Sequence, residues 1–150
     1  MMENRSFDHF FGFMKSPDYP IEGLSGNETN PAPDGSTVKV GKGAQNAGDL
    51  WPDPGHDFSD VTEQIFNDRT AVNTGTATMA GFVNNYQRHT NNPKKARKIM
   101  KCFDPAQIPV LTTLAKEYAI CDHWYSSMPG PTLPNRAFVR VMPELLNDGR

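Results

Sequence analysis

The chain has 150 residues, a formal net charge of −2 and 37% hydrophobic residues, with 12 glycines and 13 prolines. The small net charge argues against nucleic acid or an anionic membrane surface as a partner. No stretch approaches the roughly 18–20 apolar residues of a transmembrane segment, and no signal peptide is visible. The sequence therefore predicts a soluble, loop-rich chain of single-domain size.

The first predicted helix follows Ser6, a suitable N-cap residue. Its apolar positions repeat at i, i+3, i+4 and i+7, which is typical of one helix face; they are Phe7, Phe10, Phe11 and Met14. From Ser16 to Pro54 the chain is rich in Gly, Pro, Asn and Asp without a sustained period. A stretch of this kind predicts a long functional loop or a disordered segment, with a short hairpin arm in the sequence STVKVGKG.

Two further helices are predicted in the middle of the chain. Asp57 or Ser59 caps the first, and both helices show apolar residues at helical spacing. These residues are Phe58, Val61 and Ile65 in one helix, and Met79, Phe82, Val83 and Tyr86 in the other.

The strongest helix signal begins at Asp104. This residue is an N-cap, Pro105 occupies the first helical position, and Gln107 completes a capping box. The expected buried stripe is Ile108, Leu111, Leu114, Ala115 and Tyr118. The short apolar run that follows, residues 118–121, predicts a buried strand.

A helix followed by a strand indicates an α/β fold with partly parallel pairing. Ligands of such sheets bind beyond the carboxyl ends of the strands, which directs attention to the sequence after Cys121. The other cysteine, Cys102, lies 19 positions earlier. This spacing fits neither a zinc ribbon nor a redox motif, so two reduced thiols are favoured over a disulfide.

Thr132 follows a Pro-Gly-Pro turn and precedes a predicted helix in which Pro134 is tolerated in the first turn. A hydroxyl there meets free N–H groups and the positive end of the helix dipole, a site that suits an anion. From the local pattern alone, a threonine that only caps the helix is the favoured interpretation.

Three other polar residues suggest chemistry. Glu3 and Asn4 offer oxygens of the kind that hard divalent cations bind, although a solvated chain end is the simpler explanation. His56 is suited to binding phosphate or transferring a proton near neutral pH, although an ordinary loop histidine is the commoner case.

Together these segments resemble the phosphoesterase family of non-specific phospholipases C and related acid phosphatases, within the alkaline-phosphatase-like superfamily. The resemblance rests on MENRSFDHFFG, DPGHDF, MAGFVNNY and IPVLTTLAKEYAICDHWYSSMPGPTLPNRAF, in this order between Met1 and about Val139. It implies a three-layer α/β/α domain, of which residues 1–150 are expected to form an incomplete, N-terminal part.

The resemblance also implies roles for individual residues. Glu3, Asn4 and Thr132 are expected to bind a divalent metal of unknown identity, and Thr132 is the expected nucleophile. His56 matches a histidine of the phosphate pocket and is assigned to catalysis. The residues expected to line the same pocket and bind substrate are Asn135, Arg136 and Asp122.

The expected activity is hydrolysis of a phospholipid or a small phosphomonoester through a phosphothreonine intermediate. The sequence after Val139 lacks a downstream acidic segment that the resemblance leads one to expect. A catalytically inactive remnant that binds phosphate or phospholipid is therefore the alternative.

Overall fold

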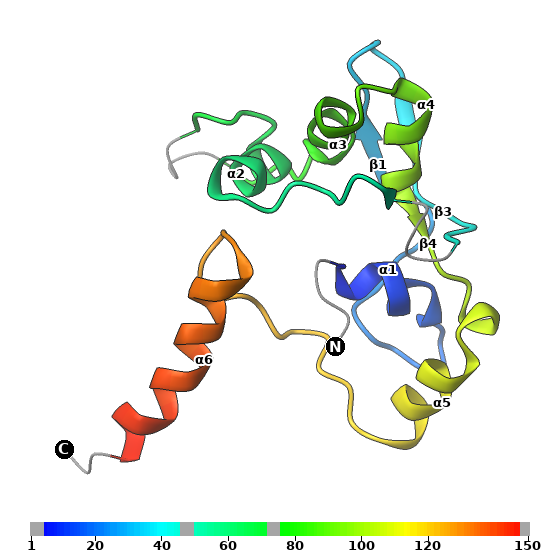
Figure 1. Ribbon diagram of the computed structural model, residues 1–150. Helices are drawn as coiled ribbons and strands as arrows, with labels where there is room; N and C mark the ends of the chain where they lie inside the picture. The colour runs from blue at the N-terminus through cyan, green and yellow to red at the C-terminus, as the bar shows by residue number, and fades with distance from the viewer. Residues whose placement is uncertain (1–4, 46–49, 72–75, 148–150) are drawn as a thin grey trace.

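The computed structural model describes residues 5–45, 50–71 and 76–147, and for residues 141–147 it describes the backbone only. The described chain contains helices, most of them short, and short strands (Figure 1). In order they are α1 (Phe7–Phe11), the 3-10 helix η1 (Gly12–Met14), β1 (Thr29–Pro31), β2 (Thr37–Lys39), β3 (Gly41–Lys42), α2 (Phe58–Phe66), α3 (Phe82–Thr90), α4 (Pro93–Ala96), the 3-10 helix η3 (Arg97–Met100), β4 (Lys101–Cys102), the 3-10 helix η4 (Pro105–Gln107), α5 (Pro109–Glu117) and α6 (Thr132–Asn147).

The described strands form two separate two-stranded sheets. β2 lies in the expected hairpin arm and pairs with β1, with Asn30 opposite Val38 in antiparallel register. β3 and β4 pair in parallel, with Gly41 opposite Lys101. This mixture of helices and strands is compatible with an α/β chain. The finer expectation of a three-layer alkaline-phosphatase-like sheet is not confirmed by the described residues.

Several local predictions are confirmed. The Ser6 hydroxyl accepts a hydrogen bond from the His9 amide at 3.1 Å and caps α1. Asp104 and Gln107 form the complete capping box at η4, directly before α5. Both interactions join residues three apart in the sequence, so the local pattern is sufficient to specify them.

Two local predictions are wrong. Residues 118–121 form no strand, and Tyr118 is 75% exposed. A strand needs a partner for its backbone N–H and C=O groups, and an apolar run does not specify one. Met79 was expected within a helix but precedes α3 with a φ of 53°. Its amide instead binds the carbonyl of Ile65 at the end of α2.

Within the part of the chain that the structure describes, two small hydrophobic clusters contribute to the core. The first joins the hairpin to α3 and α4, and its buried members are Ala32, Val38, Val83 and Ala96. The second joins η1 to α5, and its buried members are Met14, Ile21 and Ala115. α6 stands apart from these clusters, at the end of a segment without secondary structure (Figure 1). Among the described helices none is both long and apolar enough to cross a membrane.

The two cysteines are free thiols, as the sequence predicted. Cys102 in β4 is buried, whereas Cys121 is exposed.

Candidate active site

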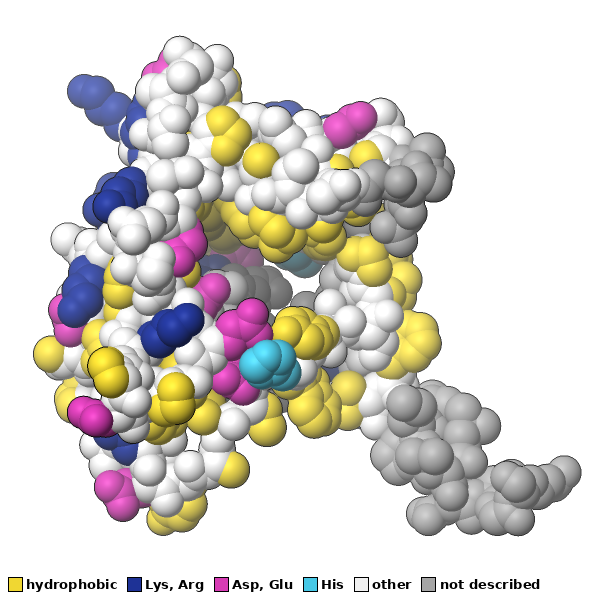
Figure 2. Space-filling view, turned by 180° about the vertical axis from the view of Figure 1, so that it is seen from behind, with side chains coloured by type: hydrophobic (Ala, Val, Ile, Leu, Met, Phe, Trp, Pro, Cys, Tyr) yellow, Lys and Arg dark blue, Asp and Glu magenta, His cyan; other side chains and the backbone are white. Residues whose placement is uncertain are grey.

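A cavity of about 990 Å³ opens where the starts of α1 and α6 face α2 and α3. Figure 2 shows a hollow near the middle of the molecule, with hydrophobic side chains gathered around it. Three of the predicted site residues line the cavity: His56, Thr132 and Asn135. They come from two segments more than 70 positions apart in the sequence, so the fold brings them together.

Thr132 is the first residue of α6 and is half-buried. The turn before it packs against the start of α2, because a Cβ placed on Gly130 would lie 2.5 Å from the ring of Phe58. Glycine is therefore needed at this close approach. The packing fixes one side of the turn that carries the threonine.

Asn135 holds the same turn together from within. Its side-chain oxygen accepts a hydrogen bond from the Met128 amide at 3.0 Å. Its side-chain nitrogen donates to the carbonyls of Met128, Gly130 and Pro131 at 3.0, 3.3 and 3.2 Å. The asparagine predicted to bind substrate thus lines the cavity while it binds the backbone of the turn that carries Thr132.

His56 is exposed and lies in the loop before α2. Its Nδ1 lies 3.3 Å from the carbonyl oxygen of Pro54. A carbonyl only accepts hydrogen bonds, so this contact assigns the proton to Nδ1 in the neutral ring and leaves Nε2 able to accept a proton.

Arg136 and Asp122 do not line this cavity. Arg136 is exposed on α6. Asp122 lies at a second, shallower cavity of about 600 Å³, where it accepts a hydrogen bond from the amide of Glu22 at 2.7 Å. That bond and one from His123 lower the pKa of Asp122. The structure thus separates these two predicted substrate-binding residues from the other three.

Glu3 and Asn4 lie outside the described residues. The two residues that follow them, Arg5 and Ser6, line the cavity together with Thr132. Arg5 also forms an ion pair with Asp53 at 3.1 Å. Among the described residues there is no group of three or more His, Cys, Asp or Glu side chains that could hold a metal ion.

Ionisable groups of α1 also line the cavity. Burial, together with the nearby carboxylates Glu28 and Glu22, raises the pKa of Asp8. Burial and the adjacent Arg5 lower the pKa of His9, which favours the neutral ring. The wall of the cavity that contains Thr132 therefore carries the positively charged Arg5 and two groups, Asp8 and His9, whose charged forms are disfavoured by burial.

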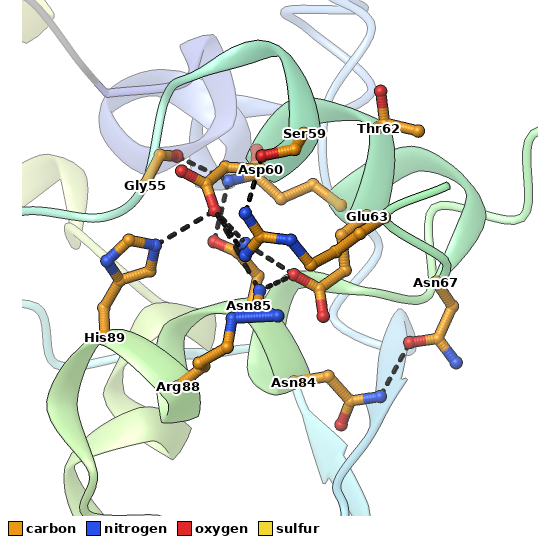
Figure 3. A network of polar contacts seen from close by, with 12 residues as sticks. Gly55, Ser59, Asp60, Thr62, Glu63, Asn67, Asn84, Asn85, Arg88 and His89 are labelled. Carbon is orange, nitrogen blue, oxygen red and sulfur yellow. Dashed lines mark hydrogen bonds and ion pairs between the residues drawn. The ribbon is translucent and has the colours of Figure 1, made fainter. Parts of the chain in front are cut away.

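A buried polar network supports the loop that carries His56 (Figure 3). Asp60 and Asn85 are 4% and 1% exposed. The Asn85 side-chain nitrogen donates to Asp60 Oδ1 at 3.0 Å and to Glu63 Oε2 at 2.8 Å. The His89 Nε2 lies 3.1 Å from Asp60 Oδ1, and Arg88 pairs with Glu63. Although burial raises the pKa of Asp60, the bonds from Asn85 and His89 lower it overall.

This network was not among the features predicted from the sequence. A signal was present, since polar residues repeat at helical spacing on the facing sides of α2 and α3. They are Asp60, Glu63 and Gln64 in α2, and Asn85, Arg88 and His89 in α3. A polar stripe at i, i+3 and i+4 is usually a solvated face, and only the tertiary structure shows that these two stripes meet.

The family model that matches the chain is described as the Phosphoesterase family and covers residues 1–141. The chain belongs to this family.

Curated relatives are named as phospholipases C. Non-specific phospholipase C6 of Arabidopsis thaliana is 40% identical over 93% of this chain and 26% of the relative. Non-specific phospholipase C1 of the same plant is 39% identical, with the same shares. Non-hemolytic phospholipase C of Pseudomonas aeruginosa is 30% identical over 93% of this chain and 19% of the relative. The chain thus spans about a quarter of the length of its plant relatives.

Proposed function

We propose that the chain carries the nucleophile of a metal-dependent phosphoesterase of the phospholipase C or acid phosphatase type. Its substrate is a phospholipid or a small phosphomonoester. The observation that carries the proposal is the cavity that gathers Thr132, His56 and the residues directly after Glu3 and Asn4. Membership of the Phosphoesterase family and the names of the relatives support it.

Thr132 is the nucleophile in this proposal. Its hydroxyl oxygen loses its proton and forms a bond to phosphorus while the bond from phosphorus to the leaving oxygen breaks, and the leaving oxygen takes up a proton and departs as the alcohol. Water then attacks the phosphorus of the phosphothreonine, or of its diester equivalent when the substrate is a phospholipid. The bond from phosphorus to the threonine oxygen breaks, the phosphate product leaves, and the threonine oxygen regains a proton. A threonine hydroxyl is a weak nucleophile at its ordinary pKa and needs activation.

His56 supplies a route for the proton. The ring with its proton on Nδ1 presents an unprotonated Nε2, which accepts the proton that Thr132 loses during attack. The start of α6 supplies stabilisation, since the backbone amides of its first turn and the helix dipole favour negative charge on the phosphoryl oxygens. Pro134 contributes no N–H there, so the backbone donors at the start of this helix are Thr132 and Leu133.

The donor set fits a hard divalent cation in its chemistry. A carboxylate from Glu3, an amide oxygen from Asn4 and the hydroxyl of Thr132 are all oxygen ligands. When bound, such a cation would neutralise charge on the phosphoryl oxygens and lower the pKa of the threonine hydroxyl.

The test measures release of p-nitrophenol from its phosphate and phosphorylcholine esters, with Ca²⁺, Mg²⁺, Mn²⁺ or Zn²⁺ added singly. We expect Thr132→Ala to reduce hydrolysis at least about 100-fold, because the covalent intermediate is lost. Thr113→Ala is the matched control, since Thr113 is an exposed threonine on α5, away from the cavity. It is expected to retain the activity.

Hydrolysis that survives Thr132→Ala would overturn the proposed mechanism. The remnant that binds phosphate without turnover predicts a different pattern. In that case both variants and the unaltered chain bind inorganic phosphate, and none releases p-nitrophenol.

A further inference from the structure

We propose that Gln64, Asn85 and the Asp60–His89 pair are positioning residues that hold the Gly55–His56 backbone, and with it the ring of His56, in place at the cavity. The inference deepens the proposed function, because it concerns the histidine assigned to proton transfer. These residues act through Gly55.

The first contact is a hydrogen bond to the loop backbone. The Gln64 side-chain nitrogen donates to the carbonyl oxygen of Gly55 at 2.7 Å and to Asn85 Oδ1 at 3.1 Å. Asn85 is in turn bound to Asp60 and Glu63. One amide therefore connects the residue before His56 to the buried centre of the α2–α3 interface.

The second contact is steric. A Cβ placed on Gly55 would lie 2.2 Å from His89 Nε2 and 2.5 Å from Asp60 Cγ. The backbone of the loop thus lies directly on the Asp60–His89 pair, at a distance that only glycine permits. Figure 3 shows Gly55, Asp60 and His89 gathered at one side of the network.

The network can hold the loop because its own members have fixed positions. The Asp60 carboxylate lies 3.4 Å from Arg69 and 3.9 Å from Arg88, in addition to its contacts with Asn85 and His89. A buried carboxylate with this many partners cannot move without leaving charges unpaired, which is costly. Gly55 is therefore fixed by its carbonyl and by its α-carbon, and His56 is the next residue.

The test uses NMR of the ring nitrogens of His56 in the 150-residue chain, because these nitrogens report which tautomer is present. In the unaltered chain we expect the tautomer protonated on Nδ1 to predominate when the His56 ring is uncharged. Gln64→Leu keeps the side-chain volume and removes the bond to Gly55. We expect it to reduce the share of this tautomer at least about twofold.

Asn84→Ala is the matched control. Asn84 also connects α3 to the end of α2, through a hydrogen bond of 2.6 Å to Asn67, but it does not contact Gly55. We expect this variant to leave the His56 tautomer unchanged. An equal effect of the two variants would mean that only general α2–α3 packing is involved, and would overturn the proposal.

A measurement on the unaltered chain makes the test independent of any variant's folding. The hydrogen bond from the Gln64 side-chain nitrogen to the Gly55 carbonyl oxygen is the contact that holds the loop. In the unaltered chain we expect a scalar coupling across this hydrogen bond, measured by NMR between the Gln64 side-chain nitrogen and the Gly55 carbonyl carbon.

Absence of that coupling, together with an unchanged tautomer in Gln64→Leu, would overturn the inference. None of these readouts requires turnover, so a failure of the Thr132→Ala test leaves them interpretable. A failure here likewise leaves the nucleophile assignment standing.

Discussion

The carboxylate of Glu28 binds the turn that precedes it. Its Oε1 accepts hydrogen bonds from the amide and the hydroxyl of Ser25 at 2.9 and 2.7 Å, and its Oε2 accepts one from the Gly26 amide at 2.9 Å. Burial raises the pKa of Glu28, but these bonds outweigh it and lower the pKa from 4.5 to about 2. The residue thus stabilises a turn at the edge of the cavity only when it is ionised.

This pKa predicts acid sensitivity. The pKa is lower in the folded chain than its ordinary value, so the stabilisation is complete above about pH 4.5 and is lost as the pH falls toward 2. We expect Glu28→Gln to reduce the free energy of unfolding at pH 7 by about 1 kcal/mol, since solvent screens an exposed side chain. Urea unfolding at several pH values should also show a flatter dependence between pH 4.5 and 2.

Glu117→Gln removes an exposed carboxylate at the end of α5 and serves as the control. A pH dependence altered equally by both substitutions would contradict the role assigned to Glu28.

At the scale of the element, caps could be predicted from the sequence and pairings could not. Ser6 and the Asp104–Gln107 capping box bind within three positions of the chain, so the local pattern specifies them. The bond between Asp60 and Asn85 spans 25 positions. The pattern that would reveal it depends on two helix faces meeting, which is a property of the tertiary structure.

The N-cap of α1 can be tested directly. Ser6→Ala removes the hydrogen bond to the His9 amide, and we expect a loss of about 1 kcal/mol in the free energy of unfolding. Ser16→Ala makes the same chemical change at an exposed serine in the next turn and should alter stability by less than about 0.5 kcal/mol. Equal losses measured by urea unfolding would show that the cap does not stabilise α1.

At the scale of the molecule, the sequence predicted the cavity residues Thr132 and His56 through the motifs that carry them. It did not predict that Asp122 and Arg136 would lie away from the cavity. Asp122 follows the apolar run at residues 118–121, and its predicted place depended on that run being a strand. Residues 118–121 form no strand, so Asp122 does not follow a strand end, and its carboxylate accepts a hydrogen bond from the Glu22 amide.

The two thiols report whether the whole chain folds. Burial raises the pKa of Cys102 to about 12, so this thiol is both shielded and protonated at neutral pH. Cys121 is exposed. We expect a thiol reagent to modify one cysteine rapidly in the native chain and two in urea. Cys121→Ser should abolish the rapid phase, whereas rapid modification of both native thiols would contradict burial of β4.

The four hydrogen bonds of Asn135 have a consequence for how Thr132 can move. They close the Met128–Pro131 turn on the first turn of the same helix, so local bonds maintain the mutual geometry of the hydroxyl and its surrounding amides, in addition to the packing of Gly130 against Phe58. Any displacement of α6 would then carry this group along as a rigid unit. Its distance from His56 would change, while its internal arrangement would survive.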